Sequence, residues 1–193
     1  MRGDPAGRTV YLTFDDGPVP GSTERVLALL ARWDALATFF PIGEQIAMYP
    51  ELARAEAAAG HAIGSHTWHH ENLASAGAGA LDATVGASLR ALRRATHRTT
   101  SCLRPPFGAI AGSTASRAAA LGLRLVLWDV DPQDWRLPGS GAIAARVLAG
   151  VRPGSIVLLH DGGGPRGGTI AALGTILRVL TARGYRFAAL PCG

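Results

Sequence analysis

Short apolar segments alternate along this chain with longer segments in which apolar residues recur at helical spacing. A run of four or five apolar residues, rich in β-branched and aromatic side chains, is typical of a buried strand, whereas apolar positions three and four residues apart predict a helix. The pattern predicts seven strands, at residues 10–14, 37–40, 62–65, 102–104, 125–128, 155–159 and 186–190. It predicts six helices between them, at residues 23–33, 51–59, 80–96, 114–121, 142–148 and 170–183.

Two of the predicted helices carry recognisable end signals. Ser22 stands just before the helix at 23–33, where a serine hydroxyl can accept a hydrogen bond from a free backbone N–H. Gly184 follows the helix at 170–183, in the position where glycine takes the left-handed conformation that ends many helices. We therefore expect these helices to begin and end close to these residues.

The alternation of strands and helices is typical of a parallel sheet covered by helices. The 193 residues suit one domain with a sizeable core, and no linker divides them, so we expect a single α/β domain over residues 1–193. The pattern alone is compatible with a barrel and with an open, doubly wound sheet.

Composition and cysteine content bear on the compartment. The chain is 48% hydrophobic and 17% charged, which is typical of a globular protein, and no apolar run approaches the roughly 20 residues that span a bilayer. Residues 1–8 are polar and do not resemble a signal peptide, so the protein is either cytoplasmic or the sequence begins after a leader. Cys102 and Cys192 would form one disulfide in an oxidising compartment, or would be two buried thiols.

The net charge is +5, and all 19 basic residues are arginine. Such a charge can attract anionic partners. The arginines are scattered, however, except for one group that we interpret as the solvated face of a helix: Arg90, Arg93, Arg94 and Arg98. Because few aromatic residues accompany this group, we expect no nucleic-acid binding.

Charged and imidazole side chains are concentrated where predicted strands end. Asp15 and Asp16 follow the first strand directly, and His160 ends the sixth. The C-terminal ends of parallel strands share one rim, where active sites of α/β proteins lie, so we expect these side chains to converge. The others at such positions are His66 and His70 after the third strand, Arg104 at the end of the fourth, and Asp131 and Asp134 after the fifth.

These residue types suit metal-assisted hydrolysis of an acyl bond. Two histidines and one carboxylate form a three-ligand metal set with positions open for water and substrate. His66 and His70 are four residues apart, so one helical turn would direct both imidazoles to one side. Of Asp15 and Asp16, one would bind the metal and the other would take a proton from water, while His160 could protonate the leaving group. Taken singly, each pattern is more often a turn, a surface pair or a core residue; their convergence favours a site.

Five short segments carry these residues, and they read TFDDG at 13–17, HTWHH at 66–70, RPPFG at 104–108, DPQDW at 131–135 and LLH at 158–160. In this order they resemble the five motifs of NodB-type polysaccharide deacetylases, which form carbohydrate esterase family four. The resemblance covers nearly the whole chain, from Val10 to Leu190. It implies a distorted (β/α) barrel with about seven parallel strands.

The resemblance also implies roles for individual residues. Asp16, His66 and His70 would bind a divalent metal, which we expect to be zinc, with cobalt or another divalent ion as the alternative. Asp15 would be the general base and His160 the general acid.

The remaining implied roles concern support and substrate. Arg104 would orient Asp15, and Asp134 would pair with His160; we choose Asp134 over Asp131 because it directly precedes a tryptophan, as in the family motif. Phe107 stands where tyrosine is frequent, a change that preserves the backbone amide expected to stabilise an oxyanion. The implied substrate contacts are Pro105, Phe107, Trp135 and Leu158.

The function we expect is hydrolysis of acetyl groups from a carbohydrate, by N-deacetylation of N-acetylglucosamine units in peptidoglycan or chitin-like oligomers. The alternatives are an acetylxylan esterase, a small-molecule deacetylase and a non-catalytic glycan-binding module. We expect a monomer that acts on an acetylated polysaccharide or oligosaccharide, secreted or associated with the cell wall.

Overall fold

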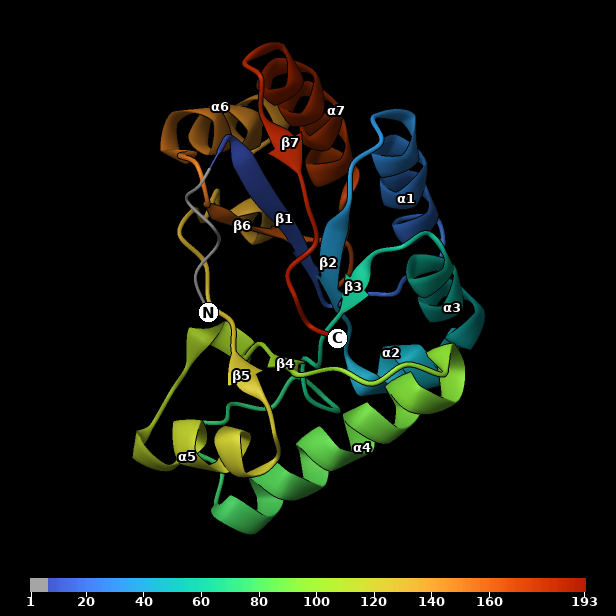
Figure 1. The fold of residues 1–193 in the computed structure, drawn as a ribbon, viewed down its shortest axis with the longest axis vertical. Coiled ribbons are helices and arrows are strands. Elements are labelled where there is room, and N and C mark those ends of the chain that lie inside the picture. The colour runs from blue at the N-terminus through green and yellow to red at the C-terminus, as the bar shows by residue number, and fades with distance from the viewer. Residues whose placement is uncertain (1–6) are drawn as a thin grey trace.

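Parallel strands and α-helices alternate over residues 7–193, the part of the chain that the computed structural model describes (Figure 1). The strands are β1 (Thr9–Asp15), β2 (Ala37–Phe40), β3 (Ala62–Ile63), β4 (Cys102–Leu103), β5 (Arg124–Leu125), β6 (Ile156–His160) and β7 (Arg186–Phe187). The helices are α1 (Thr23–Arg32), α2 (Gly43–Met48), α3 (Pro50–Ala58), α4 (Ala78–Thr96), α5 (Gly112–Ala120), α6 (Ser140–Gly150) and α7 (Gly167–Ala182). Two single-turn 3-10 helices span Pro106–Gly108 and Asp134–Arg136.

The strands form a distorted barrel. Five strands make one parallel sheet in which β1 pairs with β2, β6 and β7, and β2 pairs with β3. β4 and β5 form a separate parallel pair. Two isolated parallel bridges connect this pair to the larger sheet: Ser65, in the segment after β3, pairs with Leu103 of β4, and Val130, in the segment after β5, pairs with Val157 of β6. The ring is therefore closed by single bridges where the strands are shortest.

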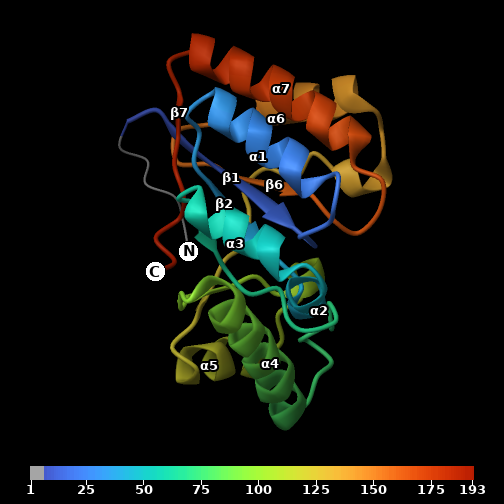
Figure 2. The ribbon, with the colours of Figure 1, turned by 90° about the vertical axis from the view of Figure 1, so that its right-hand side faces the viewer.

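The central strands are apolar because helices cover them. β1 and β6 are buried almost throughout, as expected for parallel strands with a covered face. α1, α6 and α7 pack together at one end of the molecule, and α4 and α5 lie at the other end beside β4 and β5 (Figures 1 and 2). The largest apolar cluster includes Leu12 and Phe14 of β1, Leu30 of α1 and Leu177 of α7. This packing fixes β1 and β6, whose ends carry the site.

The fold predicted from the sequence is confirmed, with corrections in detail. α2 was not predicted, and the predicted strand at 125–128 is a strand only at Arg124–Leu125. Ser22 does not cap α1, since it makes no side-chain capping bond. The hydroxyl of the next residue, Thr23, instead accepts a hydrogen bond from Val19 N at 2.8 Å. Gly184 lies just after α7 with φ of 77°, as its position predicts.

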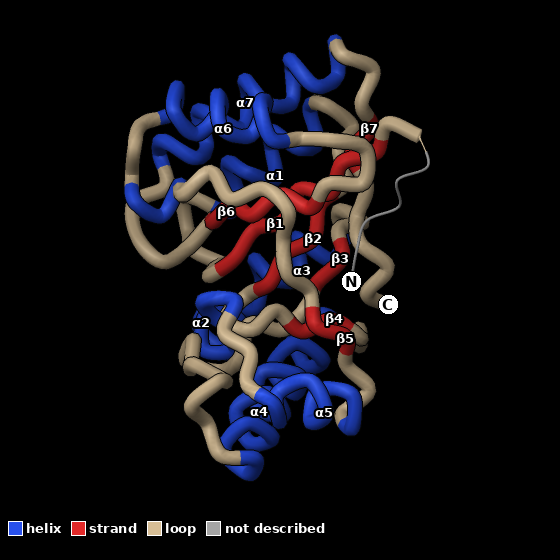
Figure 3. Tube along the Cα trace, turned by 90° about the vertical axis from the view of Figure 1, so that its left-hand side faces the viewer, coloured by secondary structure: helices blue, strands red, loops and turns tan. Residues whose placement is uncertain are grey.

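The C-terminal segment is tied to β4. Cys102 and Cys192 form a disulfide, which decides between the two alternatives that the sequence left open. Cys192 O also accepts a hydrogen bond from Ser101 N at 2.6 Å. Both cysteines are buried. In Figure 3 the chain accordingly ends close to β4 and β5.

Candidate active site

The predicted site residues lie at the C-terminal ends of the strands. Asp15 ends β1, and in the sheet register it stands opposite His160 of β6 on one side and Phe40 of β2 on the other. His66 and His70 lie in the loop after β3, and Arg104 directly follows β4. The structure therefore brings together side chains from four strand ends.

Asp16, His66 and His70 form a compact three-ligand group. One potential ligand atom from each lies within 4.8 Å of the others. Asp16 Oδ1 is 3.5 Å from His66 Nε2 and 3.6 Å from His70 Nε2, too long for hydrogen bonds. Asp16 Oδ1 is also buried without a hydrogen-bond partner among the described residues.

This geometry fits a divalent metal. Two ligand atoms about 2.1 Å from a tetrahedral zinc ion lie roughly 3.4 Å apart, close to the two separations from Asp16 Oδ1. His66 Nδ1 lies 2.8 Å from the carbonyl oxygen of Arg104, so donation by Nδ1–H to this carbonyl leaves Nε2 free to bind a metal. Burial lowers the pKa of His66 to about 3, which keeps the imidazole in the neutral form that binds metals.

The histidines are not on a helical turn, contrary to the prediction from their spacing. The segment between β3 and α4 is a loop, in which Thr67 and His70 have φ of 69° and 64°. Asp16 is also left-handed, with φ of 72°. Non-glycine residues in this region cost about 1–3 kcal/mol each and persist only where the surroundings hold them, typically at functional sites.

Asp15 is held by Arg104. Arg104 Nη1 lies 2.7 Å from Asp15 Oδ1 and donates a second hydrogen bond of 2.7 Å to the Thr13 hydroxyl. Both charged side chains are buried, and the guanidinium stacks over the ring of Phe40 at 4.3 Å. Burial raises the pKa of Asp15 above its ordinary value, and the charge of Arg104 opposes this shift. A carboxylate with a raised pKa and one oxygen bound to Arg104 suits a general base.

His160 is paired with Asp134. His160 Nδ1 lies 2.7 Å from Asp134 Oδ1, and the backbone N–H of His160 donates to Asp134 Oδ2 at 2.9 Å. Asp134 Oδ2 also accepts a hydrogen bond of 2.8 Å from the Thr169 hydroxyl. Burial by itself lowers the pKa of His160, but the hydrogen bond and charge of Asp134 outweigh it and raise the pKa above its ordinary value. The imidazole is therefore poised to carry a proton.

The four residues expected to contact substrate fall into two groups. Phe107 is 68% exposed, and its ring meets the ring of His70 edge-on at 4.5 Å. Trp135 is 46% exposed, and Arg136 lies over its ring. Pro105 and Leu158 are buried, and Leu158 shares the face of β6 that His160 occupies.

Comparison with known proteins agrees with these motifs. A family model described as polysaccharide deacetylase matches residues 2–126, more than half of the chain. The chain belongs to the polysaccharide deacetylase family. This confirms the family that the motifs resemble, with three of the five motifs inside the matched residues, and makes the chain a hydrolase of this family, whose members are generally dependent on a divalent metal.

Related polysaccharide deacetylases span nearly the whole chain. A chitooligosaccharide deacetylase from Sinorhizobium fredii is 41% identical, over 95% of this chain and 90% of the relative. The peptidoglycan-N-acetylglucosamine deacetylase PgdA of Listeria monocytogenes is 35% identical, over 93% of this chain and 37% of that longer protein. The crystal structure of the Bc1960 peptidoglycan N-acetylglucosamine deacetylase superposes with a TM-score of 0.95 at 32% identity, covering 99% of this chain and 90% of that one.

Several residues that contact the candidate site residues were not predicted. Thr13 lies in the TFDDG motif, but nothing in the sequence indicates that its hydroxyl binds Arg104. Thr169, whose hydroxyl binds Asp134, lies outside the motifs and carries no sequence signal. Asp161 directly follows His160 at a strand end, which is a signal that could have been used. Asp131, the reserve partner for His160, is exposed and accepts a hydrogen bond from Gln133 N instead.

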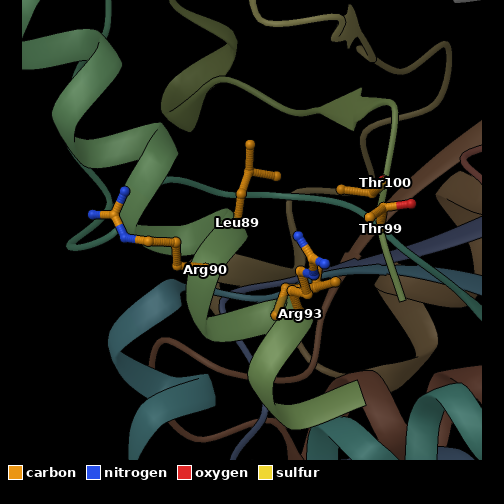
Figure 4. A pocket seen from close by; sticks show the side chains of 6 residues that line it. Leu89, Arg90, Arg93, Thr99 and Thr100 are labelled. Atoms are coloured by element: carbon orange, nitrogen blue, oxygen red, sulfur yellow. The ribbon is translucent and has the colours of Figure 1, made fainter. Parts of the chain in front are cut away.

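A hollow of about 240 Å³ lies away from these residues (Figure 4). It is formed by α4 and the segment after it, and Arg90 and Arg93 are exposed at its edge, as expected for a solvated helix face. None of the predicted site residues lines it. Its lining residues are Leu89, Arg90, Leu92, Arg93, Thr99 and Thr100.

None of the helices within residues 7–193 is long and apolar enough to cross a membrane.

Proposed function

We propose that this protein removes the N-acetyl group from N-acetylglucosamine units of a chitin-like oligomer or of peptidoglycan. The observation that carries the proposal is the placement of a base and an acid on neighbouring strands. Asp15 and His160 are paired in the β1–β6 register, next to the group formed by Asp16, His66 and His70. The relatives whose names include chitooligosaccharide and peptidoglycan-N-acetylglucosamine support this substrate class.

In the proposed mechanism Asp16, His66 and His70 would hold a divalent ion, with zinc as our choice. When bound, the ion supplies Lewis-acid polarisation of the acetyl carbonyl and acidification of a water molecule. Asp15 Oδ2, the oxygen not bound by Arg104, lies 3.8 Å from His66 Nε2 and thus faces the ligand group. Asp15 takes the proton of the attacking water, and Arg104 fixes the direction in which its free oxygen points.

Collapse of the tetrahedral adduct requires a proton on the sugar nitrogen. His160 donates that proton from Nε2, because Nδ1 is occupied by Asp134. The backbone N–H of Phe107 stabilises the negative charge that develops on the acetyl oxygen. Acetic acid and the amine leave and exchange a proton to become acetate and the ammonium form of the sugar. Transfer of the proton held by Asp15 to His160 then returns both residues to their starting states.

The proposed substrate contacts are assigned from the exposure of the side chains. Phe107 and Trp135 expose their rings at the rim and are the proposed surfaces for sugar rings. Leu158 lies on the His160 face of β6, and with Trp135 it is the proposed wall of the pocket for the acetyl methyl group. Pro105 is assigned to the support of this wall.

We further propose that the domain at 1–193 acts as a monomer, secreted or associated with the cell wall. The disulfide between Cys102 and Cys192 supports an oxidising compartment, since such bonds persist mainly outside the cytoplasm. Size-exclusion chromatography with light scattering tests the monomer.

Acetate release tests the proposed function. The metal-loaded protein is incubated with N-acetylchitooligosaccharides, with peptidoglycan and with acetylxylan, and a chelated sample serves as the control. We expect release from the N-acetylated substrates that stops on chelation and returns with zinc. Release from acetylxylan alone would replace the amide with an ester as the substrate bond, and release from none of the three would refute the proposal.

A further inference from the structure

The loop that follows β6 closes against the turn that follows β1. The backbone N–H groups of Asp161 and Gly162 donate to the carbonyl oxygen of Asp15 at 3.2 and 3.3 Å. A Cβ on Gly162 would lie 2.0 Å from the carbonyl oxygen of Asp16, so only glycine fits there. A Cβ on Gly163 would lie 2.4 Å from Asp16 Oδ2. The loop therefore leaves the turn at residues 15–17 no space to move toward it.

The side chain of Asp161 reinforces this contact. It is 1% exposed, and its carboxylate lies against Gly17, where a Cβ would come within 2.3 Å of Oδ2. Asp161 Oδ2 accepts a hydrogen bond of 2.5 Å from the Thr23 hydroxyl. That hydroxyl in turn accepts from Val19 N at 2.8 Å. Asp161 thus connects the loop of the acid His160 to both ends of the segment that begins with Asp16.

Burial of the Asp161 carboxylate has a free-energy cost that close packing alone does not explain. Asp161 Oδ1 is buried and has no hydrogen-bond partner among the described residues. A buried polar atom left without a partner costs about 1–3 kcal/mol. A second buried acid, Glu56 of α3, interacts with Asp161: its two carboxyl oxygens also lack partners in the described chain, and burial, together with the charge of Asp161, raises its pKa. An apolar side chain at position 161 would avoid this cost.

We propose that Asp161 is a positioning residue that, through Thr23 and Gly17, holds Asp16 in the conformation that binds the metal. The inference rests on the proposed function of Asp16 as a ligand. Asp16 needs such support because its backbone is left-handed, with φ of 72°. This conformation is unfavourable for residues other than glycine, and aspartate tolerates it only in part. Asp161 contacts neither substrate nor metal in this scheme.

Metal affinity of the metal-free protein is the decisive measurement. Removal of residues that support metal ligands typically weakens metal binding or activity about 10–100-fold. We expect Asp161→Ala to weaken zinc binding, measured by calorimetric titration, by about that factor. We also expect it to alter the absorption spectrum of the cobalt-loaded protein, a signature of ligand geometry that a loss of stability alone does not produce.

Thr23 offers a matched pair in case Asp161→Ala does not fold. Thr23→Val removes the hydroxyl that binds Asp161, so it should weaken zinc binding as Asp161→Ala does. Thr23→Ser keeps the hydroxyl, so it should bind zinc like the unmodified protein. Glu56→Gln is the control for a change in this buried region that leaves the turn untouched, and it should bind zinc like the unmodified protein.

The outcomes separate this inference from the proposed function. Zinc binding within twofold of the unmodified protein in a folded Asp161→Ala variant, or equal binding by Thr23→Val and Thr23→Ser, would overturn it. Failure of the unmodified protein to release acetate while it binds zinc would refute the proposed function only. Equal weakening by Glu56→Gln would also overturn it, because general disturbance of the buried region would then explain the loss.

Discussion

Replacement of Asp134 by asparagine tests the role of His160 most directly. Asp134 is fully buried and bound to His160 Nδ1 at 2.7 Å, and its hydrogen bond and charge are what raise the pKa of the imidazole against the effect of burial. Asp15 and Asp16 also raise this pKa, but each by less than Asp134 does, and both remain in the variant. Asp134→Asn should therefore lower the pKa of His160, because burial persists while the main opposing charge is lost.

The magnitude follows from the type of bond. A hydrogen bond to a charged group contributes about 1.5–3 kcal/mol, and one pKa unit corresponds to about 1.4 kcal/mol, so the shift should be roughly one to two units. A general acid works in its protonated form, and its pKa sets the alkaline limb of the rate profile. The alkaline limb of kcat/KM should therefore move to lower pH by that amount, while the acid limb, which Asp15 sets, should stay in place.

The assay is acetate release from an N-acetylchitooligosaccharide by zinc-saturated protein across the neutral and alkaline range. Thr169→Val is the matched control, since it removes one hydrogen bond to Asp134 Oδ2 but leaves the charge, and it should not move the alkaline limb. NMR titration of the His160 ring nitrogens gives the same pKa without substrate. A uniformly lower rate with an unmoved alkaline limb would refute the role of Asp134 in setting the protonation of His160.

Three further predictions concern the proposed base together with a metal ligand, a buried acid, and the disulfide. Asp15→Asn should retain zinc in elemental analysis, but its kcat should fall about 10²–10⁴-fold, the usual contribution of a general base. His66→Ala should instead lose zinc, and an active Asp15→Asn would contradict the assignment. The pKa of Glu56 is raised by burial, so its contribution to the free energy of unfolding is complete below the unfolded pKa and is lost as the pH rises toward the folded value. Glu56→Gln removes this titration, so above about pH 4.5 the variant should gain stability relative to the unmodified protein by up to about 1.4 kcal/mol per pH unit, measured by urea unfolding. Parallel pH dependences of the two proteins would exclude a buried neutral acid. Replacement of Cys102 and Cys192 by serine opens a loop closed across a sequence separation of 90 residues and should lower the free energy of unfolding by roughly 4–5 kcal/mol, seen as a lower Tm, while an unchanged Tm would show that the bond adds nothing.

The long, strongly apolar elements were predictable because their pattern reflects burial on all sides. β1, β2 and β6 were predicted to within a residue or so at each end, since a strand covered by helices must be continuously apolar. α2 was not predictable in this way, because Gly43–Met48 is under two turns long and shows no helical period. The prediction that Ser22 caps α1 was wrong for a related reason: the neighbouring Thr23 hydroxyl, which donates a hydrogen bond to the distant Asp161, accepts the bond from Val19 N in this turn.

The identity of the site residues was within reach of the sequence, but their mutual geometry was not. Asp16, His66 and His70 stand at strand ends in motifs that the family shares, and this is visible in the linear chain. Their spacing suggested a helical turn, yet His70 reaches the site from a left-handed loop position. A backbone of that kind is held by surrounding contacts rather than by local preference, so local sequence does not reveal it.

The linear sequence was enough for the parallel α/β architecture, the family, the choice of Asp134 over Asp131 and the set of residues available for metal-dependent hydrolysis. The folded structure was needed to show the hydrogen bond between Asp134 and His160, the disulfide between Cys102 and Cys192, and the burial of Asp161 and Glu56. The physical reason is that pairing, burial and pKa depend on which atoms surround a group, and these come from segments far apart in the chain. Hydrophobic periodicity records whether a position faces the core, but it does not record which neighbour it meets there.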